Sequence, residues 1–384
     1  MENLELRPLN VLIGANGAGK TNFVEFFRLL RAMVDQNLRK AVSLGGGADA
    51  WLHLGPKVTK RIVGKLQFGN TGYEFSLVPT SDNRLIFERE LALYSGLFGD
   101  HSEPFGSGYD EAKLKEHKDD PGNWGAKHGV PFYVYRAVSS WVVYHFHDTS
   151  PESGVRRQGA INDNEYLRPN AENLAAFLYG LQRTYGRCYT RIRDVVRLAA
   201  PFFDDFKLRP VADKPELIQL EWLQKGSDYP FRPSQLSDGT LRFICLATAL
   251  LQPKLPPTLL FDEPELGLHP FALTLLATLF RGVADPLLDS GQVIVSTQSA
   301  QLLNEFAPED VIVVERTEGQ STFRRLESAK LSGWLEDYTL GQLWQKNVFE
   351  GGPRNEAMPL PSHGHGEPPP LLGAEAKSSG DERP

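Results

Sequence analysis

Apolar side chains recur with a helical period just after a short hydrophobic run near the start of the chain. Residues 11–13, "VLI", have the uniform hydrophobicity of a buried strand, and a glycine-rich loop follows at residues 14–19. The next segment, "TNFVEFFRLLRAMVDQ", spaces its large apolar residues three or four positions apart, at Phe23, Phe26, Phe27, Leu30 and Met33. The pattern predicts a strand, a loop and a helix in that order.

Strict alternation of apolar and polar residues predicts antiparallel strands in the next part of the chain. The segments "RIVGKLQF", "YEFSLVP" and "RLIFERELALY" are separated by Gly-Asn and Asp-Asn pairs, which is typical of hairpins. Residues 96–130 have seven glycines and few aliphatic side chains. We expect a polar, loop-rich excursion there.

Helical and strand patterns alternate in the rest of the chain. The segment "SSWVVYHFHD" predicts a strand, residues 170–203 predict two helices, the first capped by Asn170, and "ELIQLEWLQK" predicts a further strand. After these come "LRFICLATALL", "TLLFDEPELG", "PFALTLLATLFRGVAD", "QVIVSTQS" and "DVIVVER". Their alternation of helix and short apolar strand favours a mostly parallel sheet packed between helices.

These elements predict an α/β fold with an antiparallel β subdomain and an inserted helical lobe. Residues 1–95 and 205–347 would form the two parts of the main domain, and residues 96–204 would form the loop-rich and helical insert. Residues 348–384 would be a disordered tail, because from about Gly351 the chain is too rich in Pro, Gly and charge to offset its ordering entropy by burial.

Composition narrows the class of protein. Hydrophobic residues make up 41% of the chain and charged residues 23%, as in a soluble globular protein. The first ten residues carry no secretory signal and no apolar run could span a bilayer, so we expect a cytoplasmic protein without a membrane partner. Cys188 and Cys245 lie far apart, which argues against a disulfide framework, and Cys245 in "FICLATALL" fits a buried thiol.

The charge balance restricts how the chain could contact nucleic acid. Because 41 Lys and Arg oppose 48 Asp and Glu, the net charge is −7, and DNA binding would need a local basic patch. One segment, "RTYGRCYTRIRDVVR", offers such a patch at Arg183, Arg187, Arg191 and Arg193. A solvated helix face is the alternative, and it is the one that the pattern favours.

The glycine-rich loop fits the phosphate-binding pattern G-x-x-x-x-G-K-[ST] in full. Its backbone N–H groups and the N-terminus of the following helix would hold phosphate, Lys20 would reach the β- and γ-phosphates of ATP, and the Thr21 hydroxyl would ligate Mg²⁺. The predicted nucleotide-binding residues of this loop are Gly14, Ala15, Asn16, Gly17, Ala18, Gly19, Lys20, Thr21 and Asn22.

Two further segments carry candidate chemistry. In "TLLFDEPELGLHP" an apolar strand ends in Asp262, which could hold water of the Mg²⁺ shell, and Glu263 could polarise a water that attacks the γ-phosphate. In "QLSDGTLRF", Ser237 and Gly239 precede a helical run and could bind an anion. For that segment alone, a plain serine helix cap is the favoured reading.

Together the three segments resemble the ABC-type P-loop ATPases, in particular the cytoplasmic branch with the AAA_21 family, the ATPase modules of overcoming-lysogenization-defect nucleases, RecF and SMC proteins. "GANGAGKTN", "LSDGT" and "DEPELGLHP" carry this resemblance. It implies that Ser237 and Gly239 form the signature loop, that Glu263 is the catalytic base, and that His269 lies in the D-loop. It also implies a homodimer in which each signature loop covers an ATP held by the other protomer.

The chain departs from that family in four respects. Gln298 stands where the family usually has a histidine that senses the γ-phosphate, and since an amide carries no positive charge, hydrolysis is expected to be slow. The Q-loop glutamine has only Gln158 as a candidate, and no adenine-stacking aromatic residue is identifiable. Relatives usually have one more strand and turn before the loop, so we expect a late start or a trimmed sheet edge.

The inserted segment contains no long heptad arms, and only the predicted tail follows Asn347, where nuclease relatives carry a catalytic domain. We therefore expect an ATPase that controls a separately encoded effector, such as a nuclease or toxin in phage defence, or that acts on DNA. The alternative is a nucleotide-gated scaffold or binding module with negligible hydrolysis.

Overall fold

The central sheet of the computed structural model carries the predicted strand-loop-helix unit. The structure describes residues 3–96, 99–121, 127–285, 287, 291–317 and 319–349. The chain divides into Met1–Gly352 and Pro353–Pro384, and the predicted tail from residue 350 onward lies outside the described residues. At the start of the predicted tail, Phe349 is buried and its carbonyl accepts a hydrogen bond from Arg324 at 2.8 Å.

Within the described residues the central sheet has the strand order β16-β15-β1-β14-β13-β6. All neighbouring strands are parallel except the antiparallel pair β15 and β16. This confirms the expected mostly parallel sheet. Its strands are β1 (Leu9–Ile13), β6 (Trp141–Tyr144), β13 (Thr258–Asp262), β14 (Gln292–Thr297), β15 (Val311–Thr317) and β16 (Gln320–Arg325).

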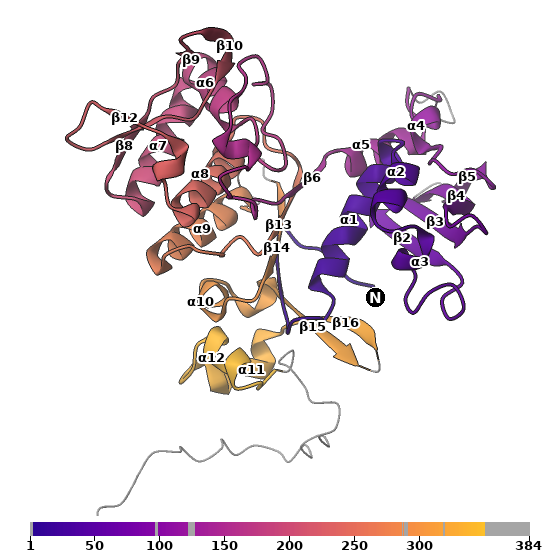
Figure 1. The fold of residues 1–384 in the computed structure, drawn as a ribbon. Helices are drawn as coiled ribbons and strands as arrows, with labels where there is room; N and C mark the ends of the chain where they lie inside the picture. The colour runs from indigo at the N-terminus through magenta and orange to yellow at the C-terminus, as the bar shows by residue number, and fades with distance from the viewer. Residues whose placement is uncertain are drawn as a thin grey trace, which may run out of the picture. The chain divides into compact units, whose positions relative to one another are not determined.

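Both faces of this sheet are buried, which explains the continuous apolar runs of its strands. Val11 and Ile13 of β1 pack into one hydrophobic cluster, while Leu12 packs into the other on the opposite face. The second cluster includes Phe23, Phe27, Leu30 and Met33, four of the five helical positions that the sequence indicated, and the fifth, Phe26, is partly buried against it. They belong to α1 (Lys20–Val34), which covers that face of the sheet (Figure 1).

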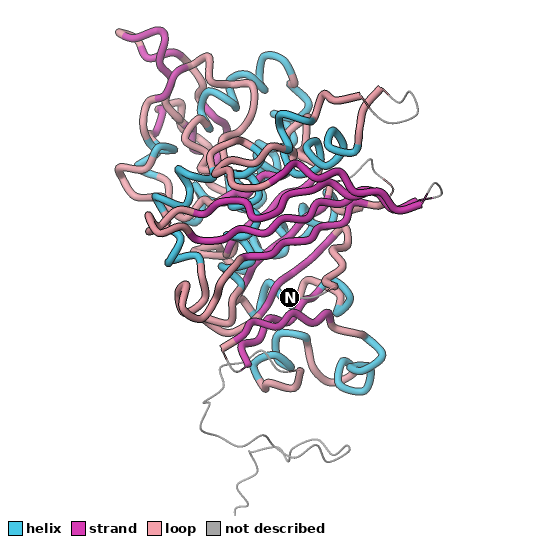
Figure 2. The backbone as a smooth tube through the Cα atoms, turned by 90° about the vertical axis from the view of Figure 1, so that its right-hand side faces the viewer, coloured by secondary structure: helices cyan, strands magenta, loops and turns pink. Residues whose placement is uncertain are grey.

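An antiparallel sheet of order β2-β3-β4-β5 adjoins α1 and faces the viewer in Figure 2. The predicted hairpins are its strands β2 (Ile62–Phe68), β3 (Thr71–Pro79) and β4 (Leu85–Gly96). The expected loop-rich excursion is wrong at β5 (Gly99–Gly106), which pairs with β4. Six of its eight residues are exposed, and five of these six are polar residues or glycine, so this edge strand shows no alternation of apolar residues. Helices α2 (Leu38–Leu44), α3 (Ala48–Trp51), α4 (Leu114–His117) and α5 (Val130–Ser139) surround this sheet and α1.

The other face of the central sheet is covered by α8 (Asp238–Leu251) and by α9 (Pro270–Val283), which contacts β14. A helical lobe of α6 (Leu174–Thr184) and α7 (Gly186–Ala199) packs on these two helices through α7. Asn170 does not cap α6, because the helix begins after Asn173, and Asn170 instead accepts a hydrogen bond from the backbone of Glu172. Its short strands form two small sheets: β8 (Phe203–Phe206), β11 (Trp222–Gln224) and β12 (Pro230–Phe231), and β7 (Gly159–Ala160), β9 (Pro210–Val211) and β10 (Lys214–Ile218).

The predicted division at residues 95, 204 and 347 stays a prediction, although β6 lies inside the predicted insert and pairs with β13 of the central sheet. Cys245 is buried and neither cysteine forms a disulfide. The remaining elements are η2 (Gly154–Arg156), η3 (Pro233–Gln235), η4 (Pro308–Asp310), α10 (Ala300–Leu303), α11 (Ser328–Leu335) and α12 (Leu340–Gln345).

Candidate functional site

The glycine-rich loop joins the end of β1 to the start of α1 at the carboxyl edge of the central sheet, where parallel sheets bind ligands. Gly19 has φ 115°, in the left-handed region that favours glycine, and a Cβ there would collide with Ser321 of β16. A Cβ at Gly17 would meet nothing within 4 Å. The β15–β16 hairpin therefore packs against the loop at Gly19 and leaves the backbone of Gly17 uncovered. Binding of phosphate to backbone N–H groups requires such an uncovered stretch of the loop.

The side chain of Lys20 lies inside this loop and binds its backbone carbonyls. Its Nζ donates to the carbonyl oxygens of Gly14 at 2.6 Å and Ala15 at 3.2 Å, and only 5% of the residue is exposed. Burial lowers the pKa of Lys20, while the charges of Glu263, Asp262 and Glu265 oppose that shift. The ammonium group thus lies among the loop carbonyls and within the field of the acidic segment. Thr21 and Asn22 are exposed at the start of α1.

The acidic segment follows β13 in a strained conformation. Asp262 is the last residue of the strand, and Glu263 has φ 42°, which costs a non-glycine residue about 1–3 kcal/mol. The backbone N–H of Glu263 donates to the carbonyl of Ser296 on the neighbouring strand β14 at 2.8 Å and so holds this conformation. Strained residues of this kind cluster at functional sites.

Gln298 contacts the predicted catalytic base directly. Its side-chain amide donates a hydrogen bond to the Glu263 carboxylate, and its backbone N–H donates to Glu265 Oε1 at 2.9 Å. The Thr297 hydroxyl donates to the same Glu265 oxygen at 2.6 Å, while the other oxygen of Glu265 is buried without a partner among the described residues. Burial raises the pKa of Glu265. Glu265 therefore holds Thr297 and Gln298 at the end of β14. In this position the side-chain amide of Gln298 reaches the Glu263 carboxylate.

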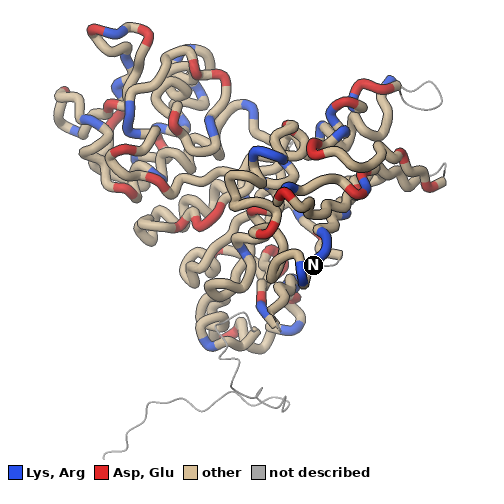
Figure 3. The backbone as a smooth tube through the Cα atoms, turned by 45° about the vertical axis from the view of Figure 1, so that its right-hand side comes forward, with Lys and Arg blue, Asp and Glu red and all other residues tan. Residues whose placement is uncertain are grey.

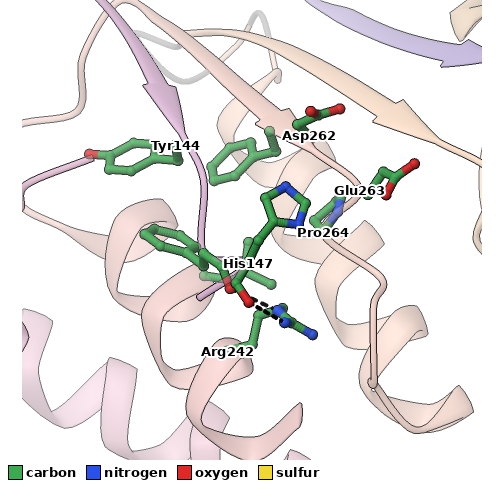
Figure 4. A pocket seen from close by; sticks show the side chains of 9 residues that line it. Tyr144, His147, Arg242, Asp262, Glu263 and Pro264 are labelled. Carbon is green, nitrogen blue, oxygen red and sulfur yellow. Dashed lines mark hydrogen bonds between the residues drawn. The ribbon is translucent and has the colours of Figure 1, made fainter. Parts of the chain in front are cut away.

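Sequence reasoning missed His147, which follows β6. Tyr144, Phe146, His147 and Arg242 line a small pocket together with residues 261–264, and the His147 imidazole points toward the end of β13 beside Pro264 and Glu263 (Figure 4). Gln158, the sequence candidate for the Q-loop, is exposed between η2 and β7. Because β6 is parallel to β13, the residues that follow both strands meet at one sheet edge, so His147 can be predicted only once the pairing of these two strands is known.

The predicted signature loop packs against the predicted D-loop. Ser237 caps α8 by accepting from Thr240 N at 3.2 Å, and a Cβ at Gly239 would collide with the carbonyl oxygen of Gly267. His269 caps α9, where its Nδ1 accepts from Phe271 N at 3.3 Å. The two loops thus form one exposed edge at the N-termini of α8 and α9.

Two buried arginines, also missed by sequence reasoning, fix this edge to the segment after β6. Arg242 donates to the carbonyl oxygens of Phe146 at 2.9 Å and His147 at 3.2 Å, and to that of Leu266. Arg156 donates to Thr149 O at 2.8 Å and binds the Asp238 carboxylate at 2.7 Å. Neither arginine belongs to a recognisable motif, and their backbone acceptors carry no side-chain signal.

Within the described residues, only part of the predicted basic patch is free of acidic partners and available to contact DNA. Arg193 lies 3.4 Å from the Asp205 carboxylate and 3.0 Å from that of Asp194. Arg183 contacts Tyr179, and Arg187 and Arg191 are exposed on α7. Positive and negative residues alternate along this lobe in Figure 3.

One family model matches most of the sequence. The model of the family described as "AAA domain, putative AbiEii toxin, Type IV TA system" matches residues 9–304. No protein with a curated description matches the chain. Among the helices of the described residues, none has the length and hydrophobicity needed to cross a membrane.

Solved structures of SMC head domains are similar over most of the chain. A structure described as "Crystal structure of the SmcHead bound to the C-winged helix domain of ScpA" has 15% identity, covers 86% of this chain and 94% of its own, and has a TM-score of 0.48. The head with an extended coiled coil bound to the C-terminal domain of ScpA, derived from Pyrococcus furiosus, has 14% identity, coverages of 86% and 92%, and a TM-score of 0.45. The SMC head domain from Thermotoga maritima has 14% identity, coverages of 84% and 92%, and a TM-score of 0.37.

Proposed function

The chain belongs to the AAA_21 family of P-loop ATPases, and on this premise we propose that it binds and hydrolyses ATP and dimerises around it. ATP would lie along the carboxyl edge of the central sheet, with its β- and γ-phosphates in the loop of residues 14–21. The observation that carries the proposal is that the sheet brings Lys20 of the phosphate loop within the field of the Asp262, Glu263 and Glu265 carboxylates.

The phosphate end of the site would be held by the chain's own donors. Lys20 would leave the carbonyls of Gly14 and Ala15 and move its ammonium group to the phosphates, whose negative charge replaces those two acceptors. Thr21 and Asp262 would hold Mg²⁺, which commonly takes one or two protein ligands together with phosphates and water. That ion, when bound, would neutralise charge that develops on the γ-phosphate.

Hydrolysis would use Glu263 as the base. A water oxygen attacks the γ-phosphorus, the bond to the bridging oxygen breaks, and the water proton passes to the Glu263 carboxylate. Gln298 orients that carboxylate through its amide and adds no positive charge, which supports a slow reaction. His147, beside Glu263, would approach the same water or phosphate oxygen.

The dimer would use the exposed edge formed by the signature loop and the D-loop. Ser237 is exposed there, and so are two large apolar side chains, Leu266 at 40% and Phe271 at 52%. Exposed apolar groups beside a polar loop suit a surface that a second copy covers only when ATP is present. In this arrangement Ser237 and Gly239 of one protomer contact the γ-phosphate held by the other.

The proposal is tested with two variants. Lys20→Ala should lose ATP binding in calorimetry, and unchanged affinity would refute the phosphate-loop assignment. Glu263→Gln should retain ATP binding, lose turnover, and accumulate dimer with ATP in light scattering. A persistent monomer would refute the dimer, and undiminished turnover would refute the role of Glu263.

A nucleotide-gated scaffold is the second candidate, and it is favoured by one observation. The Glu263 carboxylate already accepts the Gln298 amide, so its lone pairs are partly engaged before any water is bound. If purified wild-type protein with ATP and Mg²⁺ releases no phosphate at steady state but still dimerises, the scaffold replaces the enzyme.

The output of the dimer is proposed to be a separate effector, such as a nuclease or toxin of a phage-defence system, acting in the cytoplasm. Co-purification with and without ATP in the Glu263→Gln background tests this, because an effector should be enriched with the dimer. Direct action on DNA is tested by reversing the charges of Arg183, Arg187 and Arg191, which should abolish DNA binding if it depends on this patch. Retained binding would refute the patch.

A further inference from the structure

A cavity of about 420 Å³ adjoins the phosphate loop on the side away from the acidic segment. Gly17 and Asn22 of the loop line it, together with His53 before β2 and the hairpin residues Arg316, Gly319, Gln320 and Ser321. These residues come from three separate parts of the sequence. The cavity is open and its wall is mainly polar, as the mouth of a site for a polar ligand would be.

The β15–β16 hairpin reaches this cavity because it is longer than the part of β15 that pairs with β1. Pairing of β15 with β1 ends at Val313 and Ile13, whereas pairing with β16 continues through Arg316 with Ser321 to Thr317 with Gln320. The hairpin therefore extends past the end of β1 along the phosphate loop. A Cβ at Gly14 would collide with the carbonyl of Val314, which shows how closely the two backbones approach.

The strand order fixes the direction of a bound nucleotide. β13, which ends in Asp262, lies on one side of β1 beyond β14, and β15 and β16 lie on the other side. A γ-phosphate near Asp262 and Glu263 therefore directs the base and ribose toward the hairpin. Resting on the proposed ATP site, we infer that His53, Arg316 and Gln320 form the subsite for the base and ribose of a purine nucleotide.

The side-chain chemistry of this subsite suits a purine. Histidine rings and arginine guanidinium planes both stack on nucleobases. The amide of Gln320 can donate and accept at once, the arrangement that pairs with N6 and N7 of adenine. The absence of an aromatic stacking residue in the sequence pattern is explained if His53 and Arg316 supply the two flat surfaces. His53 lies next to the hairpin, since a Cβ at Gly319 would be 3.8 Å from its Nε2.

The test separates base contacts from phosphate contacts. ATP, GTP and sodium tripolyphosphate are titrated calorimetrically into the full-length protein with Mg²⁺, using wild type, His53→Ala, Arg316→Ala, Gln320→Ala and Lys20→Ala. Arg61→Ala is the control, because Arg61 is an exposed arginine that pairs with Glu88 at 3.0 Å and does not line the cavity. Circular dichroism checks that each variant is folded.

His53→Ala and Arg316→Ala should each weaken ATP binding about tenfold while tripolyphosphate binding stays within about twofold of wild type. Gln320→Ala should lower the preference for ATP over GTP by about tenfold. Wild type should bind ATP at least about tenfold more tightly than tripolyphosphate, whose weaker affinity is measured by its displacement of ATP.

Two results would overturn the subsite. If Arg316→Ala weakens tripolyphosphate as much as ATP, the cavity binds phosphate charge instead of the base. If His53→Ala and Arg316→Ala both bind ATP like the Arg61→Ala control, the base lies elsewhere. Failure of the proposed function itself has a different signature, because Lys20→Ala would then bind all three ligands like wild type.

Discussion

Replacing Arg242 by methionine is expected to loosen three segments of the chain at once. The guanidinium is buried and donates to the carbonyls of Phe146 and His147, which follow β6, and to that of Leu266 in the D-loop. Methionine keeps most of the aliphatic stem and its packing, so the change mainly removes the charged donors. The three carbonyl oxygens then lose their shared partner.

The size of the effect follows from the burial of the three bonds. The bond to Phe146 is buried, and leaving that carbonyl unsatisfied costs about 1–3 kcal/mol. The bonds to His147 and Leu266 are partly buried, so water can replace them, and each contributes about 0.5–1.5 kcal/mol. The free energy of unfolding should therefore fall by about 2–6 kcal/mol.

Urea unfolding of Arg242→Met measures this loss, with Arg61→Met as the exposed control, expected within about 0.5 kcal/mol of wild type. Arg242→Lys should lie between, since an ammonium group cannot reach all three carbonyls in the planar geometry of arginine. ATP affinity should change little, because the hydrogen bonds of Arg242 hold the segment after β6 and the D-loop and not the phosphate loop, whereas turnover should fall as His147 and the D-loop shift. A stability within about 1 kcal/mol of wild type together with normal turnover would refute the reasoning.

Three further predictions concern the same edge of the sheet. Gly239→Ala should destabilise the fold by about 1–3 kcal/mol, because its Cβ collides with the Gly267 carbonyl, and an unchanged thermal midpoint would contradict that contact. Burial raises the pKa of Glu265 in the folded protein, so the fold favours its protonated carboxyl. The contribution of this group to the free energy of unfolding is therefore complete below the ordinary glutamate pKa of about 4.3 and is lost as pH rises through the raised pKa. Glu265→Gln should therefore gain stability relative to wild type as pH rises in urea titrations, and a constant difference would count against it. Phe271→Asp in the Glu263→Gln background should bind ATP normally and remain monomeric in light scattering, and a dimer would remove Phe271 from the interface.

The sequence predicted those parts of the fold whose signal is local. β1, β13 and β14 are buried on both faces, so each reads as an apolar run, and α1 shows its buried stripe at helical spacing. β5 and β16 were missed because both are edge strands whose side chains are mostly exposed or half-buried, and backbone pairing leaves no trace in composition.

In the candidate site, too, the sequence predicted the residues of local motifs and missed those that distant segments bring together. Lys20, Asp262 and Ser237 belong to motifs in which the spacing itself encodes the geometry, and the structure brings Lys20 and Asp262 to one sheet edge. His147 and the hairpin residue Arg316 have no such motif, because each reaches the site only through the order of strands in the sheet. That order is set by contacts between distant segments and could not be deduced from residue periodicity.

The buried arginines give the proposed ATP cycle a physical route between its two ends. Arg156 ties the signature loop to the segment after β6 through Asp238, and Arg242 ties the D-loop to the same segment next to His147. A displacement of His147 on loss of the γ-phosphate would move the carbonyl that holds Arg242, and with it the contact of Gly267 and Gly239. Because coupling between two binding events is reciprocal, a dimer that needs ATP must also bind ATP more tightly than the monomer by the same factor. ATP affinity that is independent of protein concentration, across the range where light scattering detects the dimer, would break this link while leaving the ATP site itself intact.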